Sequence, residues 1–180
     1  MVVFICGLSG IGKSSLIEYV VTNFPNVRHV RASDLLASAG KPIRNLRTSD
    51  VLHNQLAFVK LAAAEIRRST HVLIDGHLLI ESLDGPISLP DNCLDALQID
   101  GVIIVTADAE QLFSRRVTAG LCTASINELA ELMSTELENA KRLAQRRRVG
   151  FATIQSGDRE NFIAQLGEMV TNYSAPAGDR

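Results

Sequence analysis

A glycine-rich segment near the amino terminus has the residue types and spacing that bind nucleotide phosphates. Residues 7–14 read Gly-Leu-Ser-Gly-Ile-Gly-Lys-Ser and fit the pattern G-x-x-x-x-G-K-[ST]. In this pattern the glycines let backbone N–H groups turn toward a polyphosphate, the lysine reaches the β- and γ-phosphates, and the serine hydroxyl binds Mg²⁺. We therefore predict a nucleotide site formed by Gly7, Ser9, Gly10, Ile11, Gly12, Lys13, Ser14 and Ser15.

The elements on either side of this segment are those that such a loop requires. Residues 2–6 form an apolar run typical of a buried strand, and residues 15–21 have the pattern of a helix. Because the strand, the loop, the Lys-Ser pair and the helix follow one another, we favour phosphate binding over a glycine turn that only packs tightly.

A second chemical signal is a carboxylate at the end of an apolar strand, in the segment Val-Leu-Ile-Asp at residues 72–75. The carboxyl ends of parallel strands form the binding edge of a sheet, so we expect Asp75 beside the phosphate loop. There it would hold Mg²⁺ together with Ser14, directly or through water. The alternative is that Asp75 only begins an Asp-Gly turn and has no chemical role. We favour the metal role, because a phosphate loop needs a second residue besides Ser14 to bind the metal.

Strand and helix signals alternate along the rest of the chain. Further strands are predicted at residues 27–31, 71–74, 101–105 and 151–155. Further helices are predicted at 34–39 after a Ser33 cap, 49–68 with a Ser49 cap, 108–119, 125–148 with a Ser125 cap, and 159–173. This alternation predicts an α/β three-layer sandwich, with a five-stranded parallel sheet covered by helices on both faces.

The length of 180 residues predicts a single domain, which we place at residues 1–173, followed by a loose tail at 174–180. Residues 77–92 contain glycine and proline and are predicted to form a long loop. Loops of that length are uncommon inside a compact domain, and this one is expected to take part in binding.

Composition indicates an ordinary globular protein that acts on small molecules. Apolar residues make up 46%, charged residues 21%, and the formal charge is −2, without the basic excess that would favour nucleic acid as a partner. The first apolar run is too short for a signal peptide or a membrane span, so we expect a cytoplasmic monomer or small homo-oligomer. Cys6, Cys93 and Cys122 are odd in number, widely spaced and without a C-x-x-C pattern, so we expect neither a disulfide framework nor a zinc site and take all three to be reduced.

Over residues 1–160 the chain resembles the nucleoside monophosphate kinases, which are P-loop NTPases, and archaeal-type adenylate kinases most of all. The resemblance rests on the loop at 7–14, Asp75-Gly76-His77, Gly85, Leu89-Pro90, the strand at 101–105 and Ser114-Arg115. It implies transfer of the γ-phosphoryl group of Mg-ATP to a nucleoside monophosphate, with AMP favoured. It also implies a monophosphate-binding segment at about 33–68 and a short lid at about 116–126.

The resemblance implies that the acceptor is held by the segment at 41–50. Arg44 and Arg47 lie there just ahead of a helix N-terminus, and guanidinium groups bind phosphate oxygens in a two-pronged geometry. Arg47 matches the archaeal-type position and is preferred, while a solvated loop is the alternative. His77 would contact the acceptor or order metal-bound water, or be a hydrogen-bonded structural residue. His53 is expected on a half-exposed helix face.

Arg115 matches the family's lid arginine, so the resemblance gives a catalytic set of Lys13, Asp75 and Arg115, the last offsetting charge on the transferred group. A second arginine cluster follows at 142–148. The helix at 125–148 would be about 36 Å long, whereas a five-residue strand spans about 17 Å. Residues 146–148 should therefore lie at the opposite end of the sheet, and Arg142 alone keeps a chance of facing the site.

Two departures from the family pattern leave other functions open. Leu79 stands where bacterial-type adenylate kinases have an arginine that grips the monophosphate, and residues 118–124 lack the arginines of archaeal-type lids. The alternatives are a kinase for another small-molecule or RNA-end acceptor, and a non-kinase ATP-hydrolysing switch or assembly factor that docks to a partner.

Overall fold

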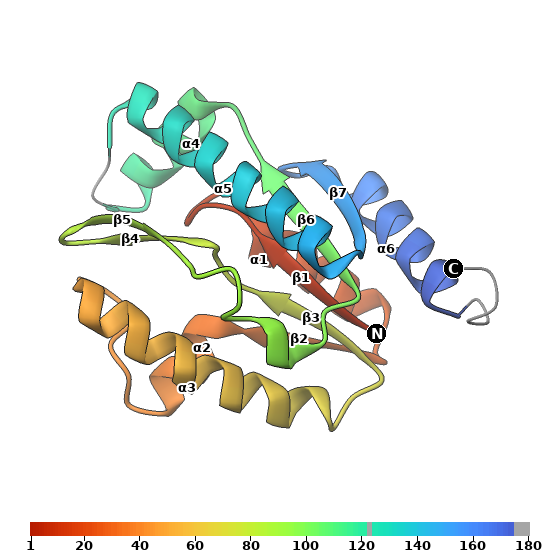
Figure 1. The fold of residues 1–180 in the computed structure, drawn as a ribbon. Coiled ribbons are helices and arrows are strands. Elements are labelled where there is room, and N and C mark those ends of the chain that lie inside the picture. Colours follow the sequence, from red (N-terminus) through yellow and green to blue (C-terminus); the bar gives the residue numbers. More distant parts are fainter. Residues whose placement is uncertain (122–123, 175–180) are drawn as a thin grey trace.

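A parallel sheet of five strands forms the centre of the molecule, in the order β2-β3-β1-β6-β7 (Figure 1). The structure is a computed structural model that describes residues 1–121 and 124–174, the last three by backbone alone. The strands are β1 Val2–Cys6, β2 Val27–Arg31, β3 His71–Asp75, β6 Gly101–Thr106 and β7 Gly150–Gln155. The predicted five-stranded parallel sheet is confirmed.

The burial of each strand follows its place in the sheet. β1 lies in the middle, and all five of its residues are buried, which matches its uninterrupted apolar sequence. β7 lies at an edge, where burial alternates and only Ala152 and Ile154 are covered. The apolar runs therefore mark central strands, and the alternating run marks an edge.

Helices cover both faces of the sheet, as the alternation of signals predicted. The helices are α1 Lys13–Asn23, α2 Ala32–Ser38, α3 Thr48–Ile66, α4 Ala109–Thr118, α5 Ile126–Arg147 and α6 Arg159–Ser174. One core contains Ile5, Leu16 and Phe162 and lies beneath α1 and α6; the other contains Phe4 and Phe58 and lies beneath α3 and α5.

One of the three predicted helix caps is confirmed. Ser125 precedes α5, where its hydroxyl accepts the Glu128 N–H at 3.3 Å and the Glu128 carboxylate accepts the Ser125 N–H at 2.7 Å. The prediction for Ser49 is wrong, because α3 begins at Thr48, whose N–H donates to Asp84 of a distant segment at 2.8 Å. The Ser33 prediction is also wrong, since α2 runs directly on from β2 and already begins at Ala32.

We expect Ser125→Ala to lower the free energy of unfolding by about 1 kcal/mol, the usual cost of losing a serine cap. Ser49→Ala is the matched control; Ser49 is exposed inside α3, and its replacement should change stability by less than about 0.5 kcal/mol. Urea unfolding of both variants measures the difference. Equal losses would contradict the assignment of the cap.

The predicted loop at residues 77–92 contains an antiparallel hairpin, which corrects the sequence analysis. β4 spans Leu79–Ser82 and pairs with β5 at Gly85–Ser88, so the turn consists of two residues, Leu83 and Asp84. The Ser82 hydroxyl donates to the Gly85 carbonyl at 2.7 Å and closes the turn. Glycine and proline in β5 concealed this hairpin, because both are unfavourable in strands. A 3-10 helix, η1 Asp95–Leu97, follows before β6.

The remaining predictions about the chain are met in part. Cys6 is buried and Cys93 is half-buried, and both are free thiols. Cys122, in the predicted lid, and residues 175–180 of the predicted tail lie outside the described residues. Among the helices that the structure describes, none is long and apolar enough to cross a membrane. The single-domain boundary stays a prediction.

Candidate functional site

The nucleotide loop, residues 7–14, connects β1 to α1 and depends on glycine for its shape. Gly7 and Gly12 have φ angles of 135° and 107°, in the region that other residues rarely adopt. A Cβ atom on Gly7 would lie 2.6 Å from the Val105 carbonyl oxygen, and one on Gly12 would lie 2.7 Å from Ser156 Oγ. α1 begins at Lys13, so the unpaired N–H groups of its first turn lie at the end of the loop.

The side chains of the loop divide into anchors and accessible groups. Leu8 and Ile11 are buried in the core beneath the loop, whereas Ser9, Gly10 and Ser15 are exposed. Ile11 can therefore offer a nucleotide only its backbone. This arrangement holds the loop firmly while leaving its tip open to solvent.

Lys13 is 5% exposed and lies inside the loop. Its Nζ donates to the Gly7 carbonyl at 2.6 Å and the Leu8 carbonyl at 3.2 Å, and lies 4.0 Å from Asp75 Oδ1. Burial lowers the pKa of the ammonium group, while the charges of Asp75 and Glu136 act in the opposite direction. The loop thus holds a cation that is close to two carboxylates and poorly hydrated.

Asp75 and Ser14 form a pair of oxygen donors at the carboxyl edge of the sheet. Ser14 Oγ donates to Asp75 Oδ2 at 2.8 Å. Burial would raise the pKa of Asp75, but His29, Lys13 and Ser14 stabilise the carboxylate and bring its pKa to about 2. The carboxylate is therefore ionised at neutral pH.

The oxygen donors of this pair fit a magnesium ion, although two nitrogen groups also lie close to the carboxylate. His29 Nε2 and Arg31 Nε each lie 3.6 Å from Asp75 Oδ2, and both nitrogens are buried without a hydrogen-bond partner. An ionised carboxylate beside a hydroxyl is the hard oxygen donor set that Mg²⁺ prefers, with the remaining positions left to phosphate oxygens and water. Ser14 and Asp75 could thus hold the metal, and this role stays a prediction.

His77 lies beneath the nucleotide loop. Its Nδ1 lies 2.7 Å from the Gly7 carbonyl oxygen, a contact that assigns the proton to Nδ1. Burial, followed by the charge of Lys13, lowers the pKa of His77 to about 3, so the ring is neutral. Of the two roles left open for this residue, the contact favours the structural one.

We expect His77 to make stability depend on pH between about 6.5 and 5. The folded ring stays neutral in this range, whereas the unfolded ring, with a pKa near 6.5, takes up a proton. The free energy of unfolding should therefore fall as the pH is lowered, with a slope that approaches about 1.4 kcal/mol per unit and a total change of roughly 1.6 kcal/mol over the range. In His77→Asn, whose amide can still donate to Gly7, this fall should disappear when urea unfolding is followed across the range.

The control for this prediction is His53→Asn, because His53 is exposed on α3, as expected from the sequence. That variant should keep the full pH dependence of the unmodified protein. The role of His77 would be refuted by an identical pH dependence in His77→Asn.

Glu136 belongs to the site and was missed in the sequence analysis. It is 1% exposed on α5 and accepts the Gly7 N–H at 3.0 Å and the Leu78 N–H at 3.0 Å. Burial raises its pKa. The available signal was spacing, because position 136 lies seven residues after Leu129 and four before Ala140 on the buried face of the helix.

The two arginines at the end of α4 each donate to a carbonyl group of the nucleotide loop. Arg115 Nη1 donates to the Ile11 carbonyl at 3.1 Å and to Ser156 Oγ at 2.7 Å. Arg116 is buried, and its Nε donates to the Ser9 carbonyl at 3.0 Å. The structure therefore brings Arg115 to the loop, together with Lys13, Ser14 and Asp75.

The predicted acceptor arginines are not gathered with these groups. Arg44 and Arg47 lie in the connection between α2 and α3, and both side chains are exposed. The Arg47 N–H donates to Asp50 Oδ2 at 2.9 Å, and the positive charge of Arg47 is one of the causes that lower the pKa of Asp84. Their acceptor role stays a prediction.

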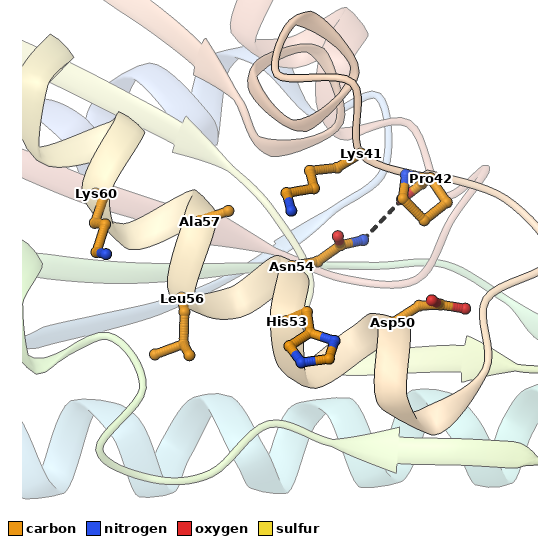
Figure 2. Close-up of a pocket in the computed structure, with 8 residues that line it drawn as sticks. All are labelled: Lys41, Pro42, Asp50, His53, Asn54, Leu56, Ala57 and Lys60. Carbon is orange, nitrogen blue, oxygen red and sulfur yellow. Dashed lines mark hydrogen bonds between the residues drawn. The ribbon is translucent and has the colours of Figure 1, made fainter.

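A groove of about 550 Å³ lies on the predicted acceptor segment, between α3 and the chain that follows α2 (Figure 2). Asn54 spans part of it by donating to the Pro42 carbonyl at 2.7 Å. Arg44 and Arg47 do not line this groove. Its lining residues are Lys41, Pro42, Asp50, His53, Asn54, Leu56, Ala57 and Lys60.

The second arginine cluster lies away from the nucleotide loop. Arg142 Nε donates to Asp91 at 2.7 Å, and Arg146 and Arg147 contact Asp95 in η1, which precedes the amino end of β6. Arg148 follows the last turn of α5. The length argument for residues 146–148 is confirmed, and Arg142 does not face the site.

Comparisons with known proteins place the fold and the family of the chain. A gluconokinase from Sinorhizobium meliloti 1021 has a similar structure, with a TM-score of 0.56 and 18% identity over 95% of this chain and 94% of that one. This likeness shows a P-loop kinase-like fold. A sequence search of the curated proteins returns no match. The family model described as AAA domain matches residues 6–125, which include the nucleotide loop, Asp75 and Arg115. The chain belongs to the AAA domain family.

Proposed function

We propose that the protein is an Mg-ATP-dependent phosphotransferase of the nucleoside monophosphate kinase type, with AMP as the favoured acceptor. The observation that carries the proposal is the 2.8 Å pair of Ser14 and Asp75 beside a buried lysine in a glycine-dependent loop. The AAA domain match and the kinase-like fold support the donor half of the proposal. The acceptor half rests on the resemblance to adenylate kinases.

The chain's own groups account for donor binding. Backbone N–H groups of the nucleotide loop and the first turn of α1 would bind the phosphates, and Lys13 would exchange its carbonyl partners for phosphate oxygens. Ser14 and Asp75 would hold Mg²⁺, and the metal would neutralise part of the charge on the phosphates. Arg115, already at the loop, would offset charge that spreads over the transferred group.

The transfer itself requires positioning more than proton movement. An oxygen of the acceptor phosphate forms a bond to the γ-phosphorus, while the bond from that phosphorus to the β–γ bridging oxygen breaks and its electron pair stays on ADP. With AMP the products are two ADP molecules. Because the attacking phosphate oxygen is already ionised, no general base is needed.

The test is to incubate the protein with Mg-ATP and each of AMP, CMP, UMP, GMP and dTMP, and to separate the nucleotides afterwards. We expect a diphosphate to form from one monophosphate, with AMP the best acceptor. Formation of ADP and inorganic phosphate at the same rate whichever monophosphate is added would refute the kinase and favour an ATP-hydrolysing switch.

A second candidate is a kinase for another small-molecule hydroxyl acceptor. It is favoured by Leu79, which is 4% exposed at the position of the bacterial-type arginine, and by the two lysines in the groove on α3. Gluconate, taken from the name of the structural neighbour, and other polyols belong in the same assay. A phosphorylated polyol with no diphosphate from any monophosphate would establish this candidate instead.

We expect Arg47→Ala to weaken acceptor binding about tenfold or more, because a guanidinium bond to phosphate is lost. The Kd for Mg-ATP should change less than twofold. Arg68→Ala, exposed beyond the opposite end of α3, is the matched control and should change neither constant. Calorimetry with each ligand measures both. An equal loss of ATP and acceptor affinity in Arg47→Ala would indicate a folding defect instead.

A further inference from the structure

The tip of the β4–β5 hairpin is bonded to the predicted acceptor segment. Asp84 accepts the Thr48 N–H at 2.8 Å and the Thr48 hydroxyl at 3.0 Å, and these bonds lower the pKa of Asp84. The Leu83 N–H donates to the Leu46 carbonyl at 2.7 Å. The hairpin turn therefore holds the start of α3, next to Arg47.

The middle of the hairpin is bonded to the nucleotide loop through Arg116. Glu81, on β4, accepts both terminal nitrogens of the Arg116 guanidinium group, at 2.6 and 2.9 Å. The same guanidinium donates through Nε to the Ser9 carbonyl at 3.0 Å. Arg116 is 2% exposed, and its Cγ lies 3.4 Å from where a Cβ atom on Gly10 would be. The arginine is thus enclosed between the hairpin and the tip of the loop.

The base of the hairpin is anchored to α5. The Leu78 N–H donates to Glu136, which also accepts the Gly7 N–H, and Asn139 donates to Ser88 Oγ at 3.0 Å. With its base fixed, the hairpin can transmit a displacement of its tip to Glu81, in its middle. The hairpin therefore connects the predicted acceptor segment to the nucleotide loop through these hydrogen bonds.

We propose that the β4–β5 hairpin couples the acceptor segment to the nucleotide loop through Glu81 and Arg116. This inference rests on the proposed function. Arg116 is a positioning residue, since three of its nitrogens bond the protein and its side chain has almost no exposed surface to offer a phosphate. A shift of the acceptor segment moves Asp84, then Glu81 and Arg116, and finally the Ser9 carbonyl. By linkage, the state of each region changes the affinity of the other.

A double-mutant cycle tests the coupling, with the Kd of the Mg complex of a non-hydrolysable ATP analogue as readout. Asp84→Ala releases the hairpin tip, and Glu81→Gln replaces the charged two-pronged contact with a neutral one. We expect each single variant to weaken nucleotide binding about fivefold. The double variant should bind no more weakly than the weaker single variant, because both act along one connection. Arg116→Lys, which keeps the charge and loses the fork, should behave like Glu81→Gln.

Asp91→Asn is the matched control, because it breaks the charged pair with Arg142 away from the nucleotide loop. Its nucleotide affinity should equal that of the unmodified protein. Thermal unfolding of every variant separates stability from coupling, since a purely structural hairpin would lower Tm without changing the Kd.

Independent losses that multiply in the double variant, or no loss in Asp84→Ala, would overturn the coupling alone. Absence of nucleotide binding by the unmodified protein would overturn the proposed function and the coupling together.

Discussion

Lys13→Ala should lower the rate of phosphoryl transfer by about 10²–10³-fold, the usual cost of removing one group that stabilises charge in a transition state. Lys13 lies in the nucleotide loop, 5% exposed, with its ammonium group 2.6 Å from the Gly7 carbonyl oxygen. A cation in so dry a position interacts with phosphate far more strongly than one in water. Single-turnover measurement with Mg-ATP and the best acceptor gives the rate.

The control for this variant is Lys141→Ala, which removes a surface lysine of α5 whose ammonium group pairs with Glu138 at 2.9 Å. Its turnover should stay within about twofold of the unmodified rate, since surface charges contribute little. Circular dichroism should show both variants folded. A Lys13→Ala protein with unchanged turnover would remove the lysine from the mechanism.

The architecture could be predicted because the sequence pattern of each element matches the burial of that element in the folded protein. β1 is apolar at every position and is buried at every position, and Asp75 ends its strand next to the loop that follows β1. In a parallel sheet these two strand ends must meet at one edge. The approach of Asp75 to Ser14 therefore followed from the order of the elements alone.

The hairpin and the start of α3 could not be predicted, because their stabilising contacts are distant in sequence. Thr48 is held by Asp84, 36 residues later, and Glu81 by Arg116, 35 residues later. Gly85 and Pro86 have low strand propensity, and tertiary bonds override it here. Ser49 has the better local signal for a cap, but a distant carboxylate determines where the helix begins.

Glu136 shows a different limit of local reasoning. A glutamate on a long helix is usually solvated, and here two backbone N–H groups and the nearby Lys13 offset part of the cost of burial, which still raises its pKa. Those partners belong to the nucleotide loop and to Leu78. The carboxylate could be recognised as part of the site only after α5 was placed over the loop.

Asp75→Asn should reduce Mg-dependent phosphoryl transfer by about 10²–10³-fold, and it tests the metal site separately from the lysine. The asparagine keeps the shape of the side chain and can still accept the Ser14 hydroxyl proton, so the change is limited to the loss of one negative charge. That charge is present at neutral pH because His29, Lys13 and Ser14 bring the pKa of Asp75 to about 2 against the effect of burial. Without it, the site offers Mg²⁺ one neutral hydroxyl and one neutral amide.

Nucleotide binding gives the sharper readout of this variant. In the unmodified protein, Mg²⁺ should strengthen ATP binding, whereas in Asp75→Asn the Kd should be nearly the same with Mg²⁺ and with EDTA, because the metal has lost its charged ligand. Asp91→Asn removes an exposed carboxylate elsewhere and should keep the full response to Mg²⁺. If Asp75→Asn kept that response as well, Asp75 would be a structural partner of Ser14 and Lys13, and the metal would depend on Ser14 and the phosphates alone.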